Sequence, residues 1–393
     1  MKIAIITSGI LPVPAVQGGA VENLIDFYLE YNDIHKLHDI TIYSIKHADT
    51  RKHLALKSKV NHYYYIDTNS MWAKIKKRLY LYKAGGEELY HYSIEFFIEQ
   101  VIKHLRRKTY DLIIIENRPV FALKLKEVTT APLVYHIHNE NMPQNLEIAN
   151  SICQAANLII CVSDYITNYT KKISSASNKC VTVHNGICTS ILYDAIRSNR
   201  KEFKIYEEDF VIAYIGRLTK EKGILQLIQA IKRLKDIHDL KLMIIGASAY
   251  GKDKRPTSFI KQLEEEITPI KDRVIFTGFI DYCNVPSYLK MADIAVVPSM
   301  WEEPFGLTVV EAMAAGLPLI TTRSGGIPEI CEGVATIVNR DNIVENLANA
   351  ILDLYHNPKK RTVMSKASFE RSRMFDKDTY SRNFFEAINN IYP

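Results

Sequence analysis

Two glutamates eight positions apart, Glu303 and Glu311, are the side chains in this sequence that best indicate a chemical function. They bracket the segment Pro-Phe-Gly-Leu-Thr-Val-Val, which follows a strand-like run at 293–298 and leads into a helix-like run at 310–315. Open α/β sheets bind ligands where their strands end, and the free amides of a helix start favour an anionic group. Carboxylates accept hydrogen bonds from sugar hydroxyls. The segment therefore predicts a site for a phosphorylated sugar.

A second motif supplies positive charge. Arg217 and Lys222 lie in the loop 216–223, between a strand-like run at 210–215 and a helix-like run at 224–231. A fixed pair of cations can neutralise a diphosphate, and arginine can bind two of its oxygens at once. Loop cations are more often only solvated, and the loop does not match the Walker A pattern, so nucleotide hydrolysis by that route is not predicted.

Two pairs of glycines follow other predicted strands. Gly18 and Gly19 come before the first helix-like run, and Gly325 and Gly326 come before a segment that begins Ile-Pro-Glu. Adjacent glycines permit a tight turn and let a phosphate or sugar approach the backbone closely. A simple connection between a strand and a helix explains each pair equally well.

Two histidines, His136 and His138, lie at the end of the strand-like run 132–137. Together with Glu140 they suggest a metal site, but no third ligand has convincing spacing. A histidine at such a position is more often a structural residue than a catalyst. We therefore predict no metal ion.

Strand-like and helix-like segments alternate along the chain, which predicts an α/β fold of parallel sheets with helical crossovers. The first series of predicted strands comprises 2–7, 39–45, 111–115, 132–137, 158–162 and 180–183, with helices at 20–31, 90–107 and 146–156. The second series comprises 210–215, 240–245, 273–276, 293–297, 317–320 and 334–338. Two such series predict two doubly wound domains and not one continuous sheet.

These series set the predicted domain boundaries. The N-terminal domain is expected at 1–190 and the C-terminal domain at 191–370, with the polar segment 189–208 as the linker region. A last helix within 371–393 is expected to pack back on the N-terminal domain. A cleft between two such domains is a natural place for a ligand to be enclosed.

The composition is that of an ordinary globular protein, with 47% hydrophobic and 24% charged residues among 393. No apolar run reaches the roughly 18 residues of a membrane-spanning helix. The first strand-like run turns polar too early for a signal peptide. The six cysteines form no CxxC pair, which favours free thiols in a reducing cytoplasm.

The net charge of +6 is concentrated in the first half, where 1–190 holds 22 Lys and Arg against 17 Asp and Glu. Much of the excess lies in 71–83 and 103–108. The segment 71–83 also carries Trp72 and several apolar residues, so peripheral contact with an anionic membrane surface is one prediction. A solvated helix face is the alternative. Nucleic-acid binding is not predicted, because no recognition motif accompanies the charge.

Taken together, the motifs resemble the retaining glycosyltransferase family 4, also called glycosyl transferases group 1, which has the GT-B fold of two Rossmann-like domains facing a cleft. The resemblance covers nearly the full length. It rests on the order and spacing of five motifs: Gly18-Gly19, His184-Asn-Gly-Ile187, Gly216-Arg-Leu-x-x-x-Lys-Gly223, Glu303-x7-Glu311 and Gly325-Gly-Ile-Pro-Glu329.

The resemblance implies a role for each motif. The C-terminal domain binds the nucleotide sugar and the N-terminal domain binds the acceptor. Arg217 and Lys222 hold the donor diphosphate, and Glu303 contacts the transferred sugar. Glu311 takes the ribose hydroxyls. The sugar and phosphate are cupped by the backbone of Phe305, Gly306, Leu307 and Thr308.

Other implied contacts complete the expected site. Gly19, with Gly18 beside it, approaches the phosphate, and the base lies near Phe279 and Ile280. His138 matches the family's position near the reacting sugar, although Asn139 follows it where the family usually has aspartate. The candidate catalytic residues are Glu303, His138, Arg217 and Lys222.

The predicted activity is transfer of a sugar from a nucleoside-diphosphate sugar, with a UDP-sugar favoured, to a hydroxyl of a glycan or lipid-linked oligosaccharide in cell-surface polysaccharide synthesis. The resemblance implies retention of anomeric configuration and implies no metal and no cofactor beyond the donor. The alternatives are a non-catalytic glycosyltransferase-like binding subunit and a GT-B-fold sugar-nucleotide epimerase. A phosphorylase would need a lysine-bound pyridoxal phosphate, for which no signature occurs.

Overall fold

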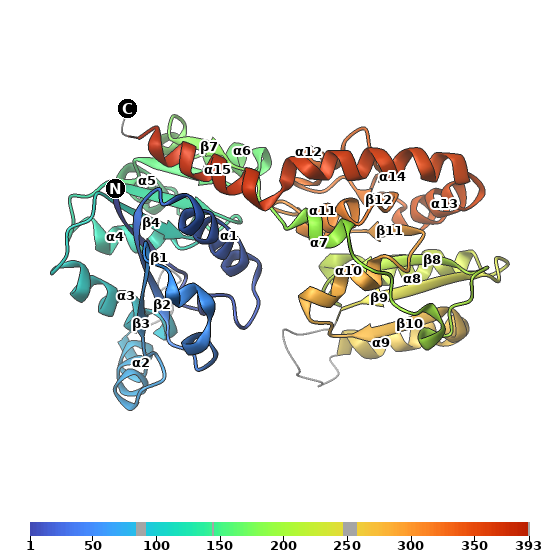
Figure 1. The fold of residues 1–393 in the computed structure, drawn as a ribbon, viewed down its shortest axis with the longest axis horizontal. Helices are drawn as coiled ribbons and strands as arrows, with labels where there is room; N and C mark the ends of the chain where they lie inside the picture. The colour runs from blue at the N-terminus through green and yellow to red at the C-terminus, as the bar shows by residue number, and fades with distance from the viewer. Residues whose placement is uncertain (84–91, 144, 247–257, 392–393) are drawn as a thin grey trace. The chain divides into compact units, whose positions relative to one another are not determined.

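The computed structural model describes residues 1–83, 92–143, 145–246 and 258–391 and forms two compact units. The first unit comprises Met1–Gly186 and Lys377–Pro393, and the second comprises Ile187–Asp376. Each unit contains one parallel sheet with packed helices (Figure 1). The predicted α/β class with two sheets is confirmed.

The first sheet has seven parallel strands in the order β3-β2-β1-β4-β5-β6-β7. The strands are β1 (Lys2–Ile6), β2 (Asp39–Ile45), β3 (Asn61–Ile66), β4 (Leu112–Glu116), β5 (Leu133–Ile137), β6 (Leu158–Cys161) and β7 (Cys180–Thr182). The inner strands β4 and β5 are buried along their whole length, as expected for a parallel sheet covered on both faces. Their carboxyl ends lie at one edge of the sheet.

Strand β3 was not predicted from the sequence. Its residues, Asn-His-Tyr-Tyr-Tyr-Ile, include a single aliphatic side chain, and it is an edge strand that is only partly buried. A strand at the edge of a sheet does not need the continuous aliphatic run that marks a central one.

The first unit contains the helices α1 (Ala20–His35), α2 (Met71–Lys83), α3 (Tyr92–Leu105), α4 (Ala122–Leu125), α5 (Leu146–Ala155), α6 (Asp164–Lys171) and α15 (Lys377–Asn389). The predicted start of α3 at residue 90 lies outside the described residues. Helix α15, drawn in red in Figure 1, packs against α1, where the ring of Phe384 stacks on Tyr28 at 4.3 Å. The last helix of the chain thereby completes the core of the first unit.

The second sheet has six parallel strands in the order β10-β9-β8-β11-β12-β13. They are β8 (Phe210–Ile215), β9 (Leu240–Ile245), β10 (Val274–Gly278), β11 (Ile294–Val297), β12 (Leu319–Thr322) and β13 (Thr336–Val338). The helices are α7 (Thr189–Tyr193), α8 (Ile224–Arg233), α9 (Ser258–Ile267), α10 (Val285–Leu289), α11 (Leu307–Ala314), α12 (Ile327–Cys331), α13 (Ile343–His356) and α14 (Pro358–Ser372).

The chain passes between the units at Gly186/Ile187 and at Asp376/Lys377, whereas the sequence placed these boundaries at 190/191 and 370/371. Helix α14 extends through the second of the predicted positions. The expected linker region 189–208 belongs to the second unit, where it contains α7 and the buried Arg200. Arg200 donates a 3.0 Å hydrogen bond to the carbonyl of Met291, which ties this segment to the unit.

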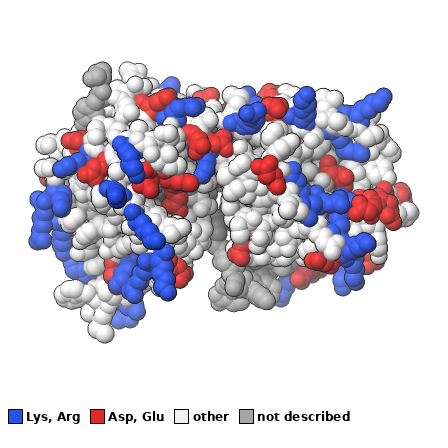
Figure 2. Space-filling view, viewed as in Figure 1, with Lys and Arg blue, Asp and Glu red and all other residues white. Residues whose placement is uncertain are grey.

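All six cysteines are free thiols, and Cys153, Cys161 and Cys331 are buried. Within the described ranges, no helix has both the length and the apolar character needed to cross a bilayer. Lys and Arg side chains gather over the part of the first unit where Figure 1 shows α2 and α3 (Figure 2).

Candidate functional site

The cationic loop of the second unit is held against the end of β11. It follows β8, contains a short 3-10 turn at Lys220–Lys222 and ends at Gly223, which has φ +71° and begins α8. A β-carbon at Gly223 would lie 1.8 Å from the carbonyl oxygen of Pro298. The amide of Met300 donates a 2.8 Å hydrogen bond to the carbonyl of Glu221. Only glycine allows this close packing, which brings Lys222 to the Glu303 loop.

Lys222 and Glu303 form an ion pair. The Nζ atom of Lys222 lies 2.6 Å from Oε1 of Glu303, and the hydroxyl of Ser299 donates a 2.7 Å hydrogen bond to the same oxygen. The indole ring of Trp301 lies 5.4 Å from the ammonium group of Lys222. Glu303 is 6% exposed, so its carboxylate is held by fixed partners and not by water.

Arg217 occupies a more open position in the same loop. Its guanidinium lies 3.9 Å from the carboxylate of Glu221, and both side chains are about two-fifths exposed. Its backbone carbonyl accepts a 2.8 Å hydrogen bond from the hydroxyl of Tyr214. The expected pair of cations is present, but Arg217 and Lys222 each have a different carboxylate partner.

The Glu303 loop is also packed against the loop after β12. The amide of Gly326 donates a 2.8 Å hydrogen bond to the carbonyl of Glu303. A β-carbon at Gly325 would lie 2.2 Å from that same carbonyl oxygen. Three loops, each following a strand of the second sheet, therefore meet around Glu303.

Helix α11 begins directly after this loop, at Leu307 and not at the predicted Val310. Gly306 precedes it with φ +116° and has no side chain to cap the helix. The first amides, those of Leu307 and Thr308 among them, belong to the helix turn whose N–H groups have no partner within the helix. Phe305 is buried and packs edge-on against Phe375 at 5.7 Å. This geometry favours an anionic group at the start of α11.

Glu311 lies one turn further along α11 and is 7% exposed. Burial raises its pKa to about 7, and a hydrogen bond with the side chain of Tyr282 opposes that rise. Burial and the carboxylate of Glu311 raise the pKa of Tyr282. Near Tyr282 in the sequence, Phe279 has an exposed side chain and Ile280 is half-buried.

The glycine loop of the first unit leads into α1. Gly18 has φ +74° and Gly19 has φ +108°. A β-carbon at Gly19 would lie 2.2 Å from a carboxylate oxygen of Glu22, whereas one at Gly18 would meet nothing within 4 Å. Burial raises the pKa of Glu22 to about 7. The positive φ of Gly19 favours glycine by itself, whether or not a ligand binds there.

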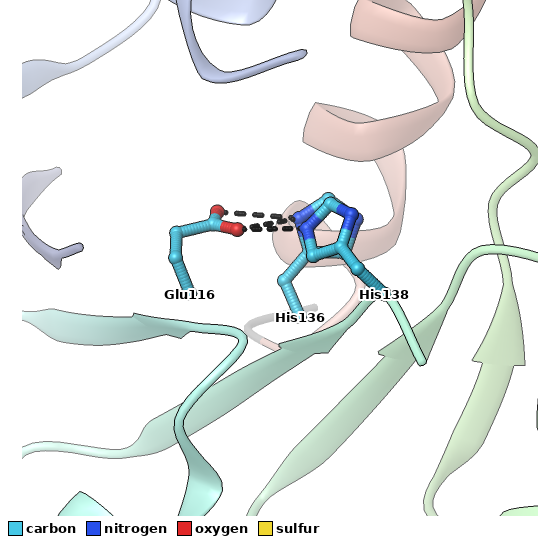
Figure 3. Close-up of side chains that lie close together, drawn as sticks. All are labelled: Glu116, His136 and His138. Atoms are coloured by element: carbon cyan, nitrogen blue, oxygen red, sulfur yellow. Dashed lines mark hydrogen bonds and ion pairs between the residues drawn. The ribbon is translucent and has the colours of Figure 1, made fainter. Parts of the chain in front are cut away.

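The two histidines of the first unit converge on a carboxylate that the sequence did not single out (Figure 3). Glu116 ends β4 and is paired in register with His136 on β5. Its Oε2 atom lies 3.0 Å from Nδ1 of His136 and 3.1 Å from Nε2 of His138, and the hydroxyl of Tyr28 donates a 2.9 Å hydrogen bond to Oε1. Glu116 and His136 are completely buried, and His138 is 8% exposed.

Glu116, His136 and His138 also form a set of potential metal ligands, whereas Glu140 bonds instead with Tyr165. The remaining ring nitrogens, Nε2 of His136 and Nδ1 of His138, are buried without a hydrogen-bond partner among the described residues. If the nitrogens facing Glu116 bound a metal, both remaining nitrogens would be protonated and would lack acceptors. Hydrogen bonding to the carboxylate fits the three residues better.

The sequence predicted the residues that bear charge but not their supports. Ser299 and Trp301 beside the Lys222–Glu303 pair and Tyr282 beside Glu311 were not identified. Glu116 had a visible signal, because a carboxylate directly follows the apolar run Leu-Ile-Ile-Ile. A charged residue at the end of a central parallel strand lies at the ligand-binding edge of such a sheet.

Comparison with known proteins identifies the family. The sequence pattern described as Glycosyl transferases group 1 matches residues 195–371, and that of Glycosyltransferase Family 4 matches residues 76–191. Spore coat protein SA of Bacillus subtilis is 30% identical over 386 residues, 94% of this chain and 93% of that protein. The lipopolysaccharide 1,2-N-acetylglucosaminetransferase of Salmonella typhimurium is 28% identical over 273 residues, 66% of this chain and 69% of that protein.

A solved structure matches the fold over the whole chain. Anabaena HepE in complex with UDP-glucose superposes with a TM-score of 0.75 at 22% identity, covering 99% of this chain and 100% of that chain. With the two parallel sheets described above, this confirms the predicted GT-B fold. The chain therefore belongs to glycosyltransferase family 4, the glycosyl transferases group 1, and is a transferase enzyme of the GT-B fold.

Proposed function

We propose that this enzyme transfers a sugar, with retention of anomeric configuration, from a UDP-sugar to a hydroxyl of a glycan or lipid-linked oligosaccharide in cell-surface polysaccharide synthesis. The observation that carries the proposal is the 2.6 Å pair between Lys222 and Glu303, just before the start of α11. It supplies a cation for a phosphate, a carboxylate for a sugar hydroxyl and a helix start that favours an anion. The complexes of HepE with UDP and with UDP-glucose support a uridine donor.

Charge stabilisation is the main contribution of the second unit to the reaction. Cleavage of the glycosidic bond leaves negative charge on the diphosphate, which Arg217, Lys222 and the first amides of α11 stabilise. Glu303 accepts a hydrogen bond from the moving sugar, and the leaving phosphate takes the proton of the acceptor. We propose that these groups compensate the charge without a metal ion. EDTA is then expected to leave turnover unchanged, and a loss that Mg²⁺ restores would contradict this part of the proposal.

The rest of the donor is assigned by position. Glu311, with Tyr282 beside it, takes the ribose hydroxyls, and the loop that contains Phe279 and Ile280 contacts the base. The first unit binds the acceptor, with Gly19 and His138 as its contributions to the reaction site. The enzyme is proposed to work at the cytoplasmic face of the membrane, without a nucleic-acid partner.

Helix α2 supports a contact with an anionic membrane. Successive residues of a helix are about 100° apart, so four of its apolar side chains fall within an arc of about 100°. All four are exposed: Met71 (80%), Trp72 (68%), Ile75 (45%) and Leu79 (56%). Lys74 and Arg78 flank this stripe on one side. Helix α2 packs on α3. Ala73, on the side away from the stripe, is fully buried, and Lys76 pairs with Glu99 of α3 at 3.6 Å.

Vesicle binding tests this contact. Phosphatidylglycerol vesicles are expected to bind the wild-type protein and to bind the double variant Trp72→Ser/Leu79→Ser at least tenfold more weakly, because both apolar area and interfacial aromatic anchoring are lost. Val363→Ser removes a side chain that is 70% exposed in the second unit and provides a matched control. Equal binding of the wild-type and double-variant proteins would refute the contact without affecting the proposed reaction.

Two substitutions test the transfer itself. Glu303→Ala and Lys222→Ala are each expected to abolish transfer from the correct donor, because each removes one half of the pair that holds sugar and phosphate. Lys232→Ala removes an ion pair of the same 2.6 Å length, with Glu266, outside the site and is expected to keep wild-type turnover. Unfolding temperatures identify variants that fail to fold. Wild-type turnover in either site variant would overturn the assignment.

Two further measurements identify the donor and distinguish a transferase from an epimerase. A thermal-shift screen across UDP-, GDP- and ADP-sugars is expected to favour UDP-sugars, since a ligand at 100 times its Kd adds about 2.7 kcal/mol of stability. Release of UDP that depends on added acceptor indicates transfer. Interconversion of the donor sugar without acceptor would favour an epimerase.

A further inference from the structure

The buried carboxylate of Glu116 accepts hydrogen bonds from three side chains. Tyr28 donates to Oε1 at 2.9 Å, and Nε2 of His138 lies 3.1 Å from Oε2. Nδ1 of His136 lies between the two oxygens, 3.2 Å from Oε1 and 3.0 Å from Oε2. Burial by itself would raise the pKa of Glu116, but its interactions with His136 and His138 lower the pKa to about 2. The carboxylate is therefore ionised at physiological pH and can only accept hydrogen bonds.

Because the ionised carboxylate of Glu116 can only accept hydrogen bonds, it determines which ring nitrogen of each histidine carries the proton. The nitrogen facing Glu116 must be N–H, so a neutral His138 is protonated at Nε2 and has a free lone pair at Nδ1. Burial, assisted by His136, lowers the pKa of His138 to about 4, against the opposing effect of Glu116, so the ring is neutral at pH 7. Nδ1 is buried and has no hydrogen-bond partner in the described part of the chain.

His138 lies at the edge of the first sheet where open α/β sheets bind ligands. It immediately follows β5, at the carboxyl edge of the first sheet, and unlike His136 and Glu116 it is not completely buried. Its backbone amide donates a 3.3 Å hydrogen bond to Oδ1 of Asn117, which follows β4 with φ +54°. Both the backbone and the far side of the ring are thus anchored to the residues that end β4.

We propose that Glu116 is a positioning residue that fixes His138 in the Nε2–H tautomer, so that Nδ1 accepts a hydrogen bond from a hydroxyl group of a bound sugar. Glu116 touches no substrate and acts only through the imidazole, while Tyr28 and His136 satisfy the rest of its carboxylate. The proposal rests on the proposed transfer reaction only for the identity of the hydroxyl. Glu116 supplies this carboxylate from β4, the strand next to β5.

The tautomer can be measured directly in the wild-type protein. Two-bond ¹⁵N–¹H correlation spectra of protein labelled at histidine distinguish Nε2–H from Nδ1–H, and a His138→Gln spectrum assigns the signal. The proposal expects the Nε2–H form of His138 at pH 7. An Nδ1–H form in the wild-type protein would overturn it, and this result needs no variant of Glu116 to fold.

Glu116→Gln is the informative substitution, because glutamine has nearly the same shape but can donate as well as accept. The tautomer of His138 is then no longer fixed, and kcat is expected to fall at least tenfold while the Kd for UDP changes less than twofold. Tyr28→Phe removes the third donor but leaves both histidine contacts, and is expected to keep the tautomer and kcat within threefold. Glu116→Asp restores an ionised acceptor and is expected to exceed Glu116→Gln in kcat.

The outcomes separate this role from a purely structural one. Loss of kcat in Glu116→Gln with an unchanged His138 tautomer would show that Glu116 acts through stability alone and would overturn the proposal. A changed tautomer with wild-type kcat would overturn it as well. If the wild-type enzyme transferred no sugar from any donor, the proposed function would fail, whereas the tautomer of His138 would still be decided by its own spectrum.

Discussion

At the residue scale, the state of ionisation of Glu311 decides how well it can make the contact with ribose that we propose for it. An ionised carboxylate accepts hydrogen bonds from two hydroxyls, and a protonated one must use one oxygen as a donor. Because burial raises the pKa of Glu311 to about 7, the free enzyme is mostly protonated at this position below that pH. The proposed ribose contact therefore predicts that the affinity for the donor depends on pH.

We predict that the Kd for UDP rises as the pH falls through about 7. Hydrogen bonds to a charged group contribute roughly 1.5–3 kcal/mol, so the change approaches one to two orders of magnitude. Glu311→Gln removes the titrating group and is expected to flatten this dependence, with weak binding throughout. Calorimetric titration of both proteins from pH 5.5 to 8.5 measures it. Protonation of UDP itself affects both proteins equally. Parallel curves of Kd against pH for the two proteins would therefore contradict the role of Glu311.

The raised pKa also predicts an effect on stability, with a definite sign. A carboxyl that binds its proton more tightly in the folded state contributes most below its unfolded pKa of about 4.5, and this contribution is lost as the pH rises through about 7. Glu311→Gln is therefore expected to unfold at a higher temperature than the wild-type protein at pH 8 and to show little difference at pH 4.5. A lower unfolding temperature at pH 8 would mean that the ionised carboxylate is well solvated.

The sequence indicated the charged residues of the site but not the groups that hold them. Lys222 and Glu303 were predicted from their loops, yet the hydroxyl of Ser299 and the ring of Trp301 became partners only through packing. A serine or a tryptophan gives no functional signal by itself in a sequence. Its role depends on which loop lies beside it, and that contact is long-range.

At the element scale, the loops around Glu303 depend on glycines that allow backbone to touch backbone. Gly325 has φ +50°, and a β-carbon there would lie 2.2 Å from the carbonyl oxygen of Glu303. Gly333 also has positive φ, +83°, but a β-carbon there would meet nothing within 4 Å. A substitution at either position costs backbone strain, but only a substitution at Gly325 would also displace Glu303.

We predict that Gly325→Ala lowers kcat/KM at least a hundredfold and that Gly333→Ala changes it less than threefold. Both variants pay about 1–2 kcal/mol for a β-carbon in the left-handed region, so both unfold at lower temperature. Only Gly325→Ala must also move the loop that carries Glu303. Steady-state kinetics measures kcat/KM of both variants, and thermal unfolding measures their loss of stability. Equal kcat/KM in both variants would show that the Gly325 contact does not position the site.

The structure differs from the sequence-based predictions at the start of one helix and at an edge strand. Helix α11 starts three residues earlier than predicted, since Gly306 in a left-handed conformation lets the chain enter the helix at Leu307. The edge strand β3 was missed because tyrosines replace the aliphatic run. The central strands were predicted, because burial on both faces demands an apolar pattern that is visible in the sequence.

At the scale of the whole molecule, the two units differ in whether they are built from one segment of the chain or from two. The second unit is one continuous segment whose ends are joined, because the amide of Ile187 donates to the carbonyl of Phe375 at 2.9 Å and Thr189 bonds with Asp376. The first unit is discontinuous and takes its last helix, α15, from the end of the chain. Four buried side chains of α15 enter its core, namely Tyr380, Phe384, Phe385 and Ile388.

We predict that a chain ending at Asp376 loses the fold of the first unit and keeps that of the second. Burial of a large apolar side chain contributes roughly 1.5–3 kcal/mol, and four of them approach the 5–15 kcal/mol that stabilises a typical domain. Hydrogen exchange is expected to show loss of protection in β1 and β4, with β8 and β11 still protected and UDP still bound. A chain ending at Asn389, the last residue of α15, is the control and is expected to match the full-length protein. Protection of β1 in the shorter chain would mean that α15 only covers a core that is complete without it.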